Sequence, residues 1–115
     1  MTTPEKPVLT FNVTGSNLTD PPTAICSPEL VTVSDPNSLV QFQIVNQGYA
    51  FDPEAPVVFD DPGANFPDIW LLSDTLVAVR DRLTSSGDYS FTINLIETGT
   101  GKRISVDPTI RNIPR

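Results

Sequence analysis

Apolar and polar residues alternate along several short stretches of the chain, and the clearest one covers residues 87–96. Within it, every second position is apolar: Tyr89, Phe91, Ile93 and Leu95. Successive side chains of a β-strand point to opposite faces, so these four share one face of an extended strand. The pattern predicts a long strand with one buried side.

The same reasoning predicts up to eight further strands. They cover residues 8–14, 30–33, 39–46, 56–59, 69–72, 76–80, 102–106 and 110–113. Segment 56–59 is flanked by proline, which lacks the amide that a central strand donates, and is therefore expected at a sheet edge. Apolar residues within 74–83 also keep helical spacing, so this segment is a candidate helix. Its β-branched residues make a strand followed by one helical turn an equally good interpretation.

Aspartate followed by proline separates many of these segments. The five pairs are Asp20-Pro21, Asp35-Pro36, Asp52-Pro53, Asp61-Pro62 and Asp107-Pro108. Such pairs favour type I turns, because the carboxylate accepts amide hydrogen bonds and proline fixes φ at the next position. Seven to nine short strands with no long amphipathic helix predict an all-β, two-sheet antiparallel β-sandwich. Residues 1–115 are expected to form one domain, with residues 1–7 as a flexible tail.

The charge distribution limits the expected partners. The chain has 14 acidic and 7 basic residues, and residues 7–79 include nine acids and no base. Nucleic-acid binding requires Lys and Arg side chains that neutralise phosphates, so no nucleic-acid partner is expected. The sequence has no secretory signal pattern, no long apolar run and no cysteine pair. We therefore expect a cytoplasmic protein that does not bind membranes.

The supply of catalytic and metal-ligating residues is poor. The chain contains no histidine and only one cysteine, Cys26. Histidine is the usual base beside a serine or cysteine nucleophile and the commonest metal ligand. Cys26 is expected to be a small buried apolar residue. The sequence predicts a protein that is not an enzyme and has no cofactor and no metal.

Two segments resemble parts of immunoglobulin-like and cupredoxin-like β-sandwich domains. Residues 85–91 resemble the start of a strand with a tyrosine corner, in which Tyr89 anchors the turn. Residues 35–48 are similar to the central cupredoxin strand and the asparagine-containing loop after it. In this comparison Ile93 and Ile96 stand where blue-copper proteins carry cysteine and histidine. The resemblance implies an immunoglobulin-like or cupredoxin-like sandwich without copper.

Segment 48–70 is the strongest candidate for a binding surface, because it holds five of the nine aromatic residues among prolines and acids. Aromatic residues amid polar groups are typical interface anchors, and loops at the ends of sandwiches often carry recognition. The candidate interaction residues are Tyr49, Phe51, Asp52, Glu54, Asp60, Asp61, Phe66 and Asp68. Phe59 and Trp70 are expected to close the core instead.

Three functional hypotheses remain open. The first is a non-enzymatic protein-interaction or structural module that binds another protein or a copy of itself, through segment 48–70 or an open sheet edge beside 56–59. The second is a calcium- or carbohydrate-binding module that uses the acidic and aromatic residues of 48–70. The third, a small hydrolase, requires two carboxylates that face each other across a cleft.

Overall fold

The computed structural model describes residues 9–16, 18, 23–60, 65–66 and 68–113. All regular secondary structure assigned within these residues is β-strand, which confirms the all-β prediction. The strands are β1 (Leu9–Ser16), β2 (Thr23–Ser27), β3 (Leu30–Val33), β4 (Ser38–Ile44), β5 (Tyr49–Phe51), β6 (Val57–Phe59), β7 (Asp68–Ser73), β8 (Leu76–Asp81), β9 (Gly87–Glu97), β10 (Arg103–Val106) and β11 (Thr109–Asn112). The predicted tail, residues 1–7, lies outside the described residues.

The count of seven to nine strands was too low, since the described part of the chain has eleven. The two additional strands are β2 and β5. β5 has only three residues, and Ile25 of β2 is exposed, so neither shows a clear alternating pattern. The helix and the helical turn considered for 74–83 are both wrong, because β8 is a strand from Leu76 to Asp81 and no helix is assigned to the described residues after it.

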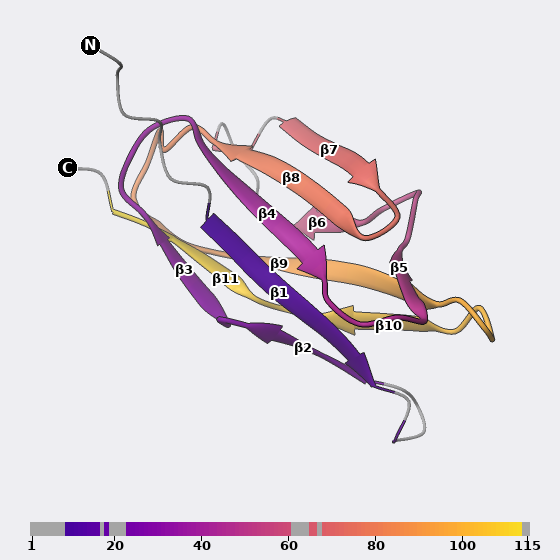
Figure 1. Ribbon diagram of the computed structural model, residues 1–115. Coiled ribbons are helices and arrows are strands. Elements are labelled where there is room, and N and C mark those ends of the chain that lie inside the picture. The colour runs from indigo at the N-terminus through magenta and orange to yellow at the C-terminus, as the bar shows by residue number, and fades with distance from the viewer. Residues whose placement is uncertain (1–8, 17, 19–22, 61–64, 67, 114–115) are drawn as a thin grey trace, which may run out of the picture.

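The strands form two sheets that pack against each other (Figure 1). One sheet has the order β2-β1-β4-β8-β7. The other is built around β9, with β5 and β6 on one side of it and β10 and β11 on the other, and with β3 beside β11. The long alternating segment of the sequence is therefore the centre of the second sheet, as its continuous apolar face requires.

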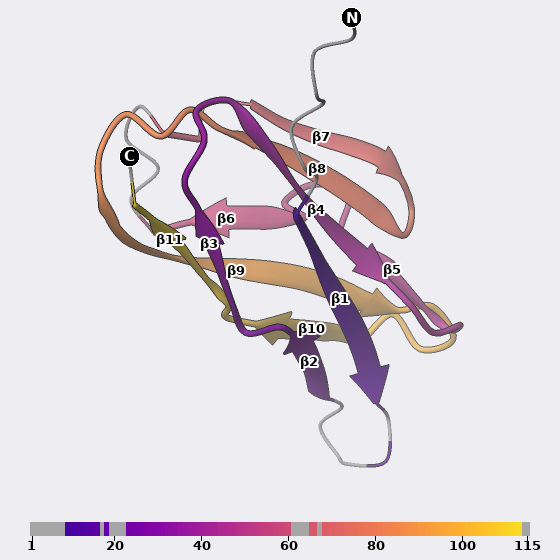
Figure 2. The same cartoon turned by 60° about the vertical axis from the view of Figure 1, so that its left-hand side comes forward.

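The expectation of a purely antiparallel sandwich is wrong for two strand pairs. β1 pairs with β4 and β3 pairs with β11 in parallel orientation. A parallel pair needs a crossover connection between its strands. For β1 and β4 this connection is β2 and β3, which belong to different sheets and so carry the chain across one side of the sandwich (Figure 2).

Aromatic side chains from both sheets meet in the core. Phe11 of β1 stacks on Phe42 of β4, with ring centroids 5.2 Å apart. Phe91 of β9 meets both rings at an angle, at 5.9 and 5.2 Å. All three side chains are buried, and each aromatic pair contributes about 0.5–1.5 kcal/mol beyond its buried area. This cluster holds the two sheets together.

Two local predictions are confirmed. The Tyr89 hydroxyl lies 2.6 Å from Ser85 Oγ and donates to the Ser86 carbonyl at 3.4 Å, so it anchors the turn before β9. Cys26 is buried, and desolvation, with a smaller contribution from the nearby charge of Glu29, raises the pKa of its thiol to about 12. The Cys26 thiol is therefore neutral at physiological pH.

Among the described strands, the sandwich is open on the side opposite to β2 and β3. Here β7 is the last strand of the first sheet, and β6 is an edge of the second, as the proline-flanked segment predicted. Both views show β7 at the rim of its sheet, beside β8 (Figures 1 and 2). Within the described residues there is no helix, and hence none that could cross a membrane.

Candidate functional site

An apolar groove of about 590 Å³ lies between strands β6 and β7. Residues from both strands and from the segments that flank β6 form its walls, among them Pro56, Val57, Phe59, Phe66, Ile69 and Leu71. Among the described residues that line the groove, Glu54 is the only charged one. Phe59 and Phe66 stack at the base with ring centroids 4.1 Å apart, so the groove has a rigid aromatic floor.

The register of β7 explains why this groove is exposed. Ile69 pairs with Val79 and Leu71 pairs with Val77, and both valines face the core. Ile69 and Leu71 therefore face the inner side of the sheet, yet each is 41% exposed. The edge strand β6 lines the other side of the groove and covers this face of β7 only in part.

Trp70 contradicts the expectation that it closes the core. It pairs with Ala78 and is 37% exposed on the outer face of the sheet, where Arg80 Cζ lies 5.5 Å from its ring centroid. Alternation requires this placement, because Ile69 and Leu71 occupy the inner face. Trp70 instead shields Ala78, which is buried on a face that is otherwise open to solvent.

The backbone of β7 offers hydrogen-bonding groups at the open edge. Ile44 of β4 donates to the Thr75 carbonyl at 2.9 Å, which makes these two residues a hydrogen-bonded pair between β4 and the start of β8. Bonding direction alternates along an antiparallel ladder, so Ala78 and Arg80 direct their backbone groups to Trp70 and Asp68.

It follows that the N–H and C=O groups of Ile69 and Leu71 point away from β8. β7 pairs only with β8 among the described residues. The same two residues thus direct their side chains into the groove and their backbone groups to the edge. A strand added at this edge would form hydrogen bonds with these backbone groups and contact these side chains in the groove.

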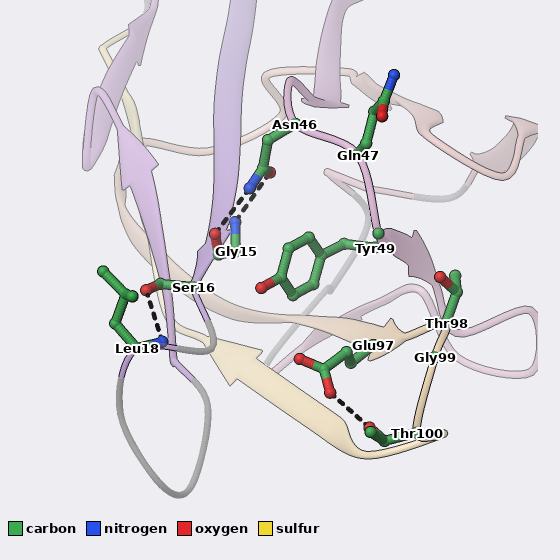
Figure 3. Close-up of a pocket in the computed structure, with 11 residues that line it drawn as sticks. Gly15, Ser16, Leu18, Asn46, Gln47, Tyr49, Glu97, Thr98, Gly99 and Thr100 are labelled. Carbon is green, nitrogen blue, oxygen red and sulfur yellow. Dashed lines mark hydrogen bonds between the residues drawn. The ribbon is translucent and has the colours of Figure 1, made fainter.

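A second pocket, which we call the polar pocket, has a volume of about 660 Å³ and lies at the C-terminal end of β1 (Figure 3). Tyr49 extends across it toward Gly15 and Ser16. A Cβ atom on Gly15 would lie only 2.5 Å from Cδ1 of Tyr49, so the ring rests directly on this glycine. Asn46 Nδ2 donates to the Gly15 carbonyl (2.8 Å) and Asn46 Oδ1 accepts from the Gly15 amide (3.1 Å).

Of the described residues that line this polar pocket, Glu97 alone is charged. Its Oε1 accepts a hydrogen bond from Thr100 Oγ1 at 2.6 Å. Its Oε2 is buried and has no hydrogen-bond partner among the described residues. An unsatisfied carboxylate oxygen is costly, and a ligand that donates a hydrogen bond would relieve this cost.

The structure does not gather the eight predicted interaction residues into one surface. Tyr49 lines the polar pocket, whereas Glu54 and Phe66 line the apolar groove. Phe51 is buried in the core. Asp61 lies outside the described residues.

The other predicted acidic residues are separated from one another. Asp52 is buried, where its Oδ1 accepts from the Glu54 amide (3.0 Å) and its Oδ2 lies 3.3 Å from Arg103 Nη2. Asp68 pairs with Arg80 at 3.4 Å, and Asp60 is exposed. Asp52 and Asp68 each face an arginine, which is not the pair of facing carboxylates that a hydrolase requires. The described part of the chain holds no group of three or more His, Cys, Asp or Glu residues placed to bind a metal ion.

Sequence reasoning placed residues 69–72 in a strand but did not name Ile69 and Leu71 as site residues. The available signal was the run Ile-Trp-Leu-Leu at residues 69–72, four consecutive apolar residues without alternation. Glu97 was also missed, because a single glutamate at the end of a strand carries no distinguishing pattern.

No protein-family model and no curated protein matches the chain. Among solved structures, one match is a cysteine protease inhibitor from Entamoeba histolytica, with a TM-score of 0.40 and 14% sequence identity. The match covers 96% of this chain and 100% of that chain. A similarity of this size carries no argument about function.

Proposed function

We propose that this domain is a non-enzymatic protein-interaction module that binds an extended protein segment along the open edge of β7. The observation that carries the proposal is the double role of Ile69 and Leu71, whose backbone groups face the edge while their side chains face the apolar groove. A strand added there would gain main-chain hydrogen bonds, and every second side chain would enter the groove.

The composition of β7 supports this proposal. Sheet edges are commonly protected by lysine, proline or inward-pointing charges, because an unprotected edge pairs with other chains. β7 has no lysine and no proline, and its single charged residue, Asp68, is paired with Arg80. Ile69, Trp70 and Leu71 are all exposed, which is typical of an interaction surface.

Selection from a displayed library of extended peptides tests this function. We expect binders with apolar residues at alternate positions, and we expect Leu71→Lys to abolish their binding because it places a charge in the groove. Ile25→Lys is the matched control, since Ile25 is an exposed apolar residue on β2, at the opposite edge of the same sheet. Hydrogen exchange should show new protection of the Ile69 and Leu71 amides in the complex. Binding that survives Leu71→Lys would contradict the proposal.

The polar pocket supports a second candidate, the binding of a saccharide or a similar hydroxyl-rich ligand. Glu97 Oε2 offers an unused acceptor, and the Tyr49 ring lies beside it (Figure 3). Sugar hydroxyls donate to carboxylates, and apolar sugar faces pack on aromatic rings. Thermal shifts with a saccharide panel test this candidate. A ligand that stabilises the wild type should lose its effect on Glu97→Gln, where one acceptor oxygen becomes a donor.

A further inference from the structure

We infer that the segment bound at β7 is β7 of a second copy of this chain, paired antiparallel about a two-fold axis that passes beside Trp70. This inference rests on the proposed function and names the partner. In the resulting homodimer, the sheet β2-β1-β4-β8-β7 of one copy joins the same sheet of the other copy through β7, and the two form one continuous sheet.

The ladder geometry limits the possible registers. Residues with outward backbone groups must face each other across the new pair, and in β7 these are Ile69 and Leu71. A two-fold axis beside Trp70 places Ile69 of each copy opposite Leu71 of the other. One competing axis, beside Leu71, would require regular pairing at Ser73, but the ladder of β7 is irregular between Leu71 and Ser73.

The side chains are self-complementary in this register. Ile69 and Leu71 of the second copy would lie on the groove side of the new strand, so each copy supplies the apolar residues that the groove of the other lacks. On the outer face Trp70 would lie opposite Trp70 of the second copy. This is a non-hydrogen-bonded position, where Cα atoms are about 4.5 Å apart and aromatic pairs are favourable.

The local charges permit this pairing, whereas the overall charge opposes it. Asp68 is paired with Arg80, and the residues that meet across the axis are apolar. Each copy nevertheless carries a formal charge of −7. Added salt screens the repulsion between the copies, so it should strengthen the dimer. A basic peptide partner would give the opposite salt dependence.

Sedimentation equilibrium on the full chain tests the inference. We expect a mass of twice 12.5 kDa and tighter association as the salt concentration rises. Leu71→Lys should weaken the dimer by at least about 100-fold, because it buries an unpaired charge. Ile25→Lys should leave it unchanged. Wild-type protein that stays monomeric at high concentration and high salt would overturn the second copy as the partner.

Cysteine cross-linking tests the register. The native Cys26 is buried, so an introduced cysteine is the reactive thiol. Under mild oxidation Trp70→Cys should form a disulfide-linked dimer, because its Cα atoms meet across the axis. A mixture of the Ile69→Cys and Leu71→Cys variants should form disulfide-linked dimers, whereas neither variant should do so by itself. Cross-linking of Leu71→Cys alone in preference to Trp70→Cys would overturn the register.

The two proposals fail in different ways. A monomer whose β7 binds selected peptides contradicts only the second copy. A monomer that binds no peptide contradicts both proposals. A dimer that is insensitive to Leu71→Lys contradicts only the second copy as the partner of β7, because its interface then lies away from β7 and peptide binding at β7 is tested separately.

Discussion

Asn112 and Asp81 connect the two sheets through a buried hydrogen bond, in which Asn112 Nδ2 on β11 donates to Asp81 Oδ1 on β8 over 3.0 Å. The same oxygen accepts from the Leu83 amide at 2.9 Å. Asp81 Oδ2 and Asn112 Oδ1 are both buried and have no partner among the described residues. Two unused acceptors in one buried pair indicate that a proton donor is missing when Asp81 is ionised.

This arrangement predicts an unusual pH dependence of stability. Burial raises the pKa of Asp81, and its two hydrogen bonds only partly oppose this effect. A raised pKa means that the folded state binds a proton more tightly than the unfolded state. The contribution of Asp81 to the free energy of unfolding is therefore full below the ordinary aspartate pKa and is lost as the pH rises through the raised value.

Asp81→Asn removes this titration and adds an amide donor that can serve Asn112 Oδ1. We expect the free energy of unfolding at pH 7 to rise by about 1 kcal/mol relative to the wild type. We also expect the advantage to shrink toward pH 4. Urea denaturation of both proteins across this range measures the difference. Equal pH profiles for the two proteins would contradict the prediction.

Asp88 serves as a control, because its contribution to the free energy of unfolding should have the opposite pH dependence. A bidentate contact with Arg111, at 2.8 and 3.1 Å, lowers the pKa of the Asp88 carboxyl. Its contribution is present at neutral pH and is lost as the pH falls through the lowered value. Because both side chains are exposed, Asp88→Asn should change stability only slightly, and only above that value.

The contact between Gly15 and Tyr49 predicts a position where alanine is not tolerated. Gly15→Ala would place Cβ within 2.6 Å of two ring atoms, so the ring or the end of β1 must move. We expect a loss of about 1–3 kcal/mol in the free energy of unfolding. Gly99→Ala is the matched control, because a Cβ atom on Gly99 would have no neighbouring atom within 4 Å. Thermal denaturation should separate the two variants by several degrees.

The buried carboxylate of Asp52 predicts unequal effects for the two sides of its ion pair. Asp52→Ala removes the acceptor for the Glu54 amide as well as the partner of Arg103. We expect a loss of about 1–2 kcal/mol. Arg103 is 69% exposed and water can replace it, so Arg103→Ala should cost less, about 0.5 kcal/mol. Chemical denaturation tests this order, and a larger effect at Arg103 would refute it.

The sequence was sufficient to predict the elements that have one buried face. Alternation in β4 and β9 identified both central strands, because a half-buried strand requires it. It did not predict β2, whose Ile25 faces solvent, or the parallel pairing of β1 with β4, which depends on where the chain crosses between the sheets. The likeness to immunoglobulin-like or cupredoxin-like domains stays a prediction.

The candidate site was only half predictable for a related reason. Segment 48–70 does contribute to the apolar groove and to the polar pocket, but composition alone could not show that Asp52 is buried or that Trp70 faces outward. Both facts depend on tertiary pairing: Arg103 comes from β10, and the orientation of Trp70 is set by its register with β8. A one-residue shift of that register would have reversed the two faces of β7.

Asn65 gives the last prediction, because it holds the base of the groove in place. Its buried Oδ1 accepts from the Thr84 amide (2.8 Å), the Thr84 hydroxyl (2.9 Å) and the Ser85 amide (3.2 Å), next to Phe66 in sequence.

Asn65→Ala leaves these donors without an acceptor and should reduce the free energy of unfolding by about 2–3 kcal/mol. Asn65→Asp keeps the acceptor, loses the donation to Ser85 Oγ and introduces a buried carboxylate that the three donors can stabilise, so we expect a smaller loss. Urea denaturation ranks the two variants, and peptide binding at β7 should weaken with Asn65→Ala as Phe66 loses its support. Equal losses for both variants would show that the shared acceptor is not what stabilises this segment.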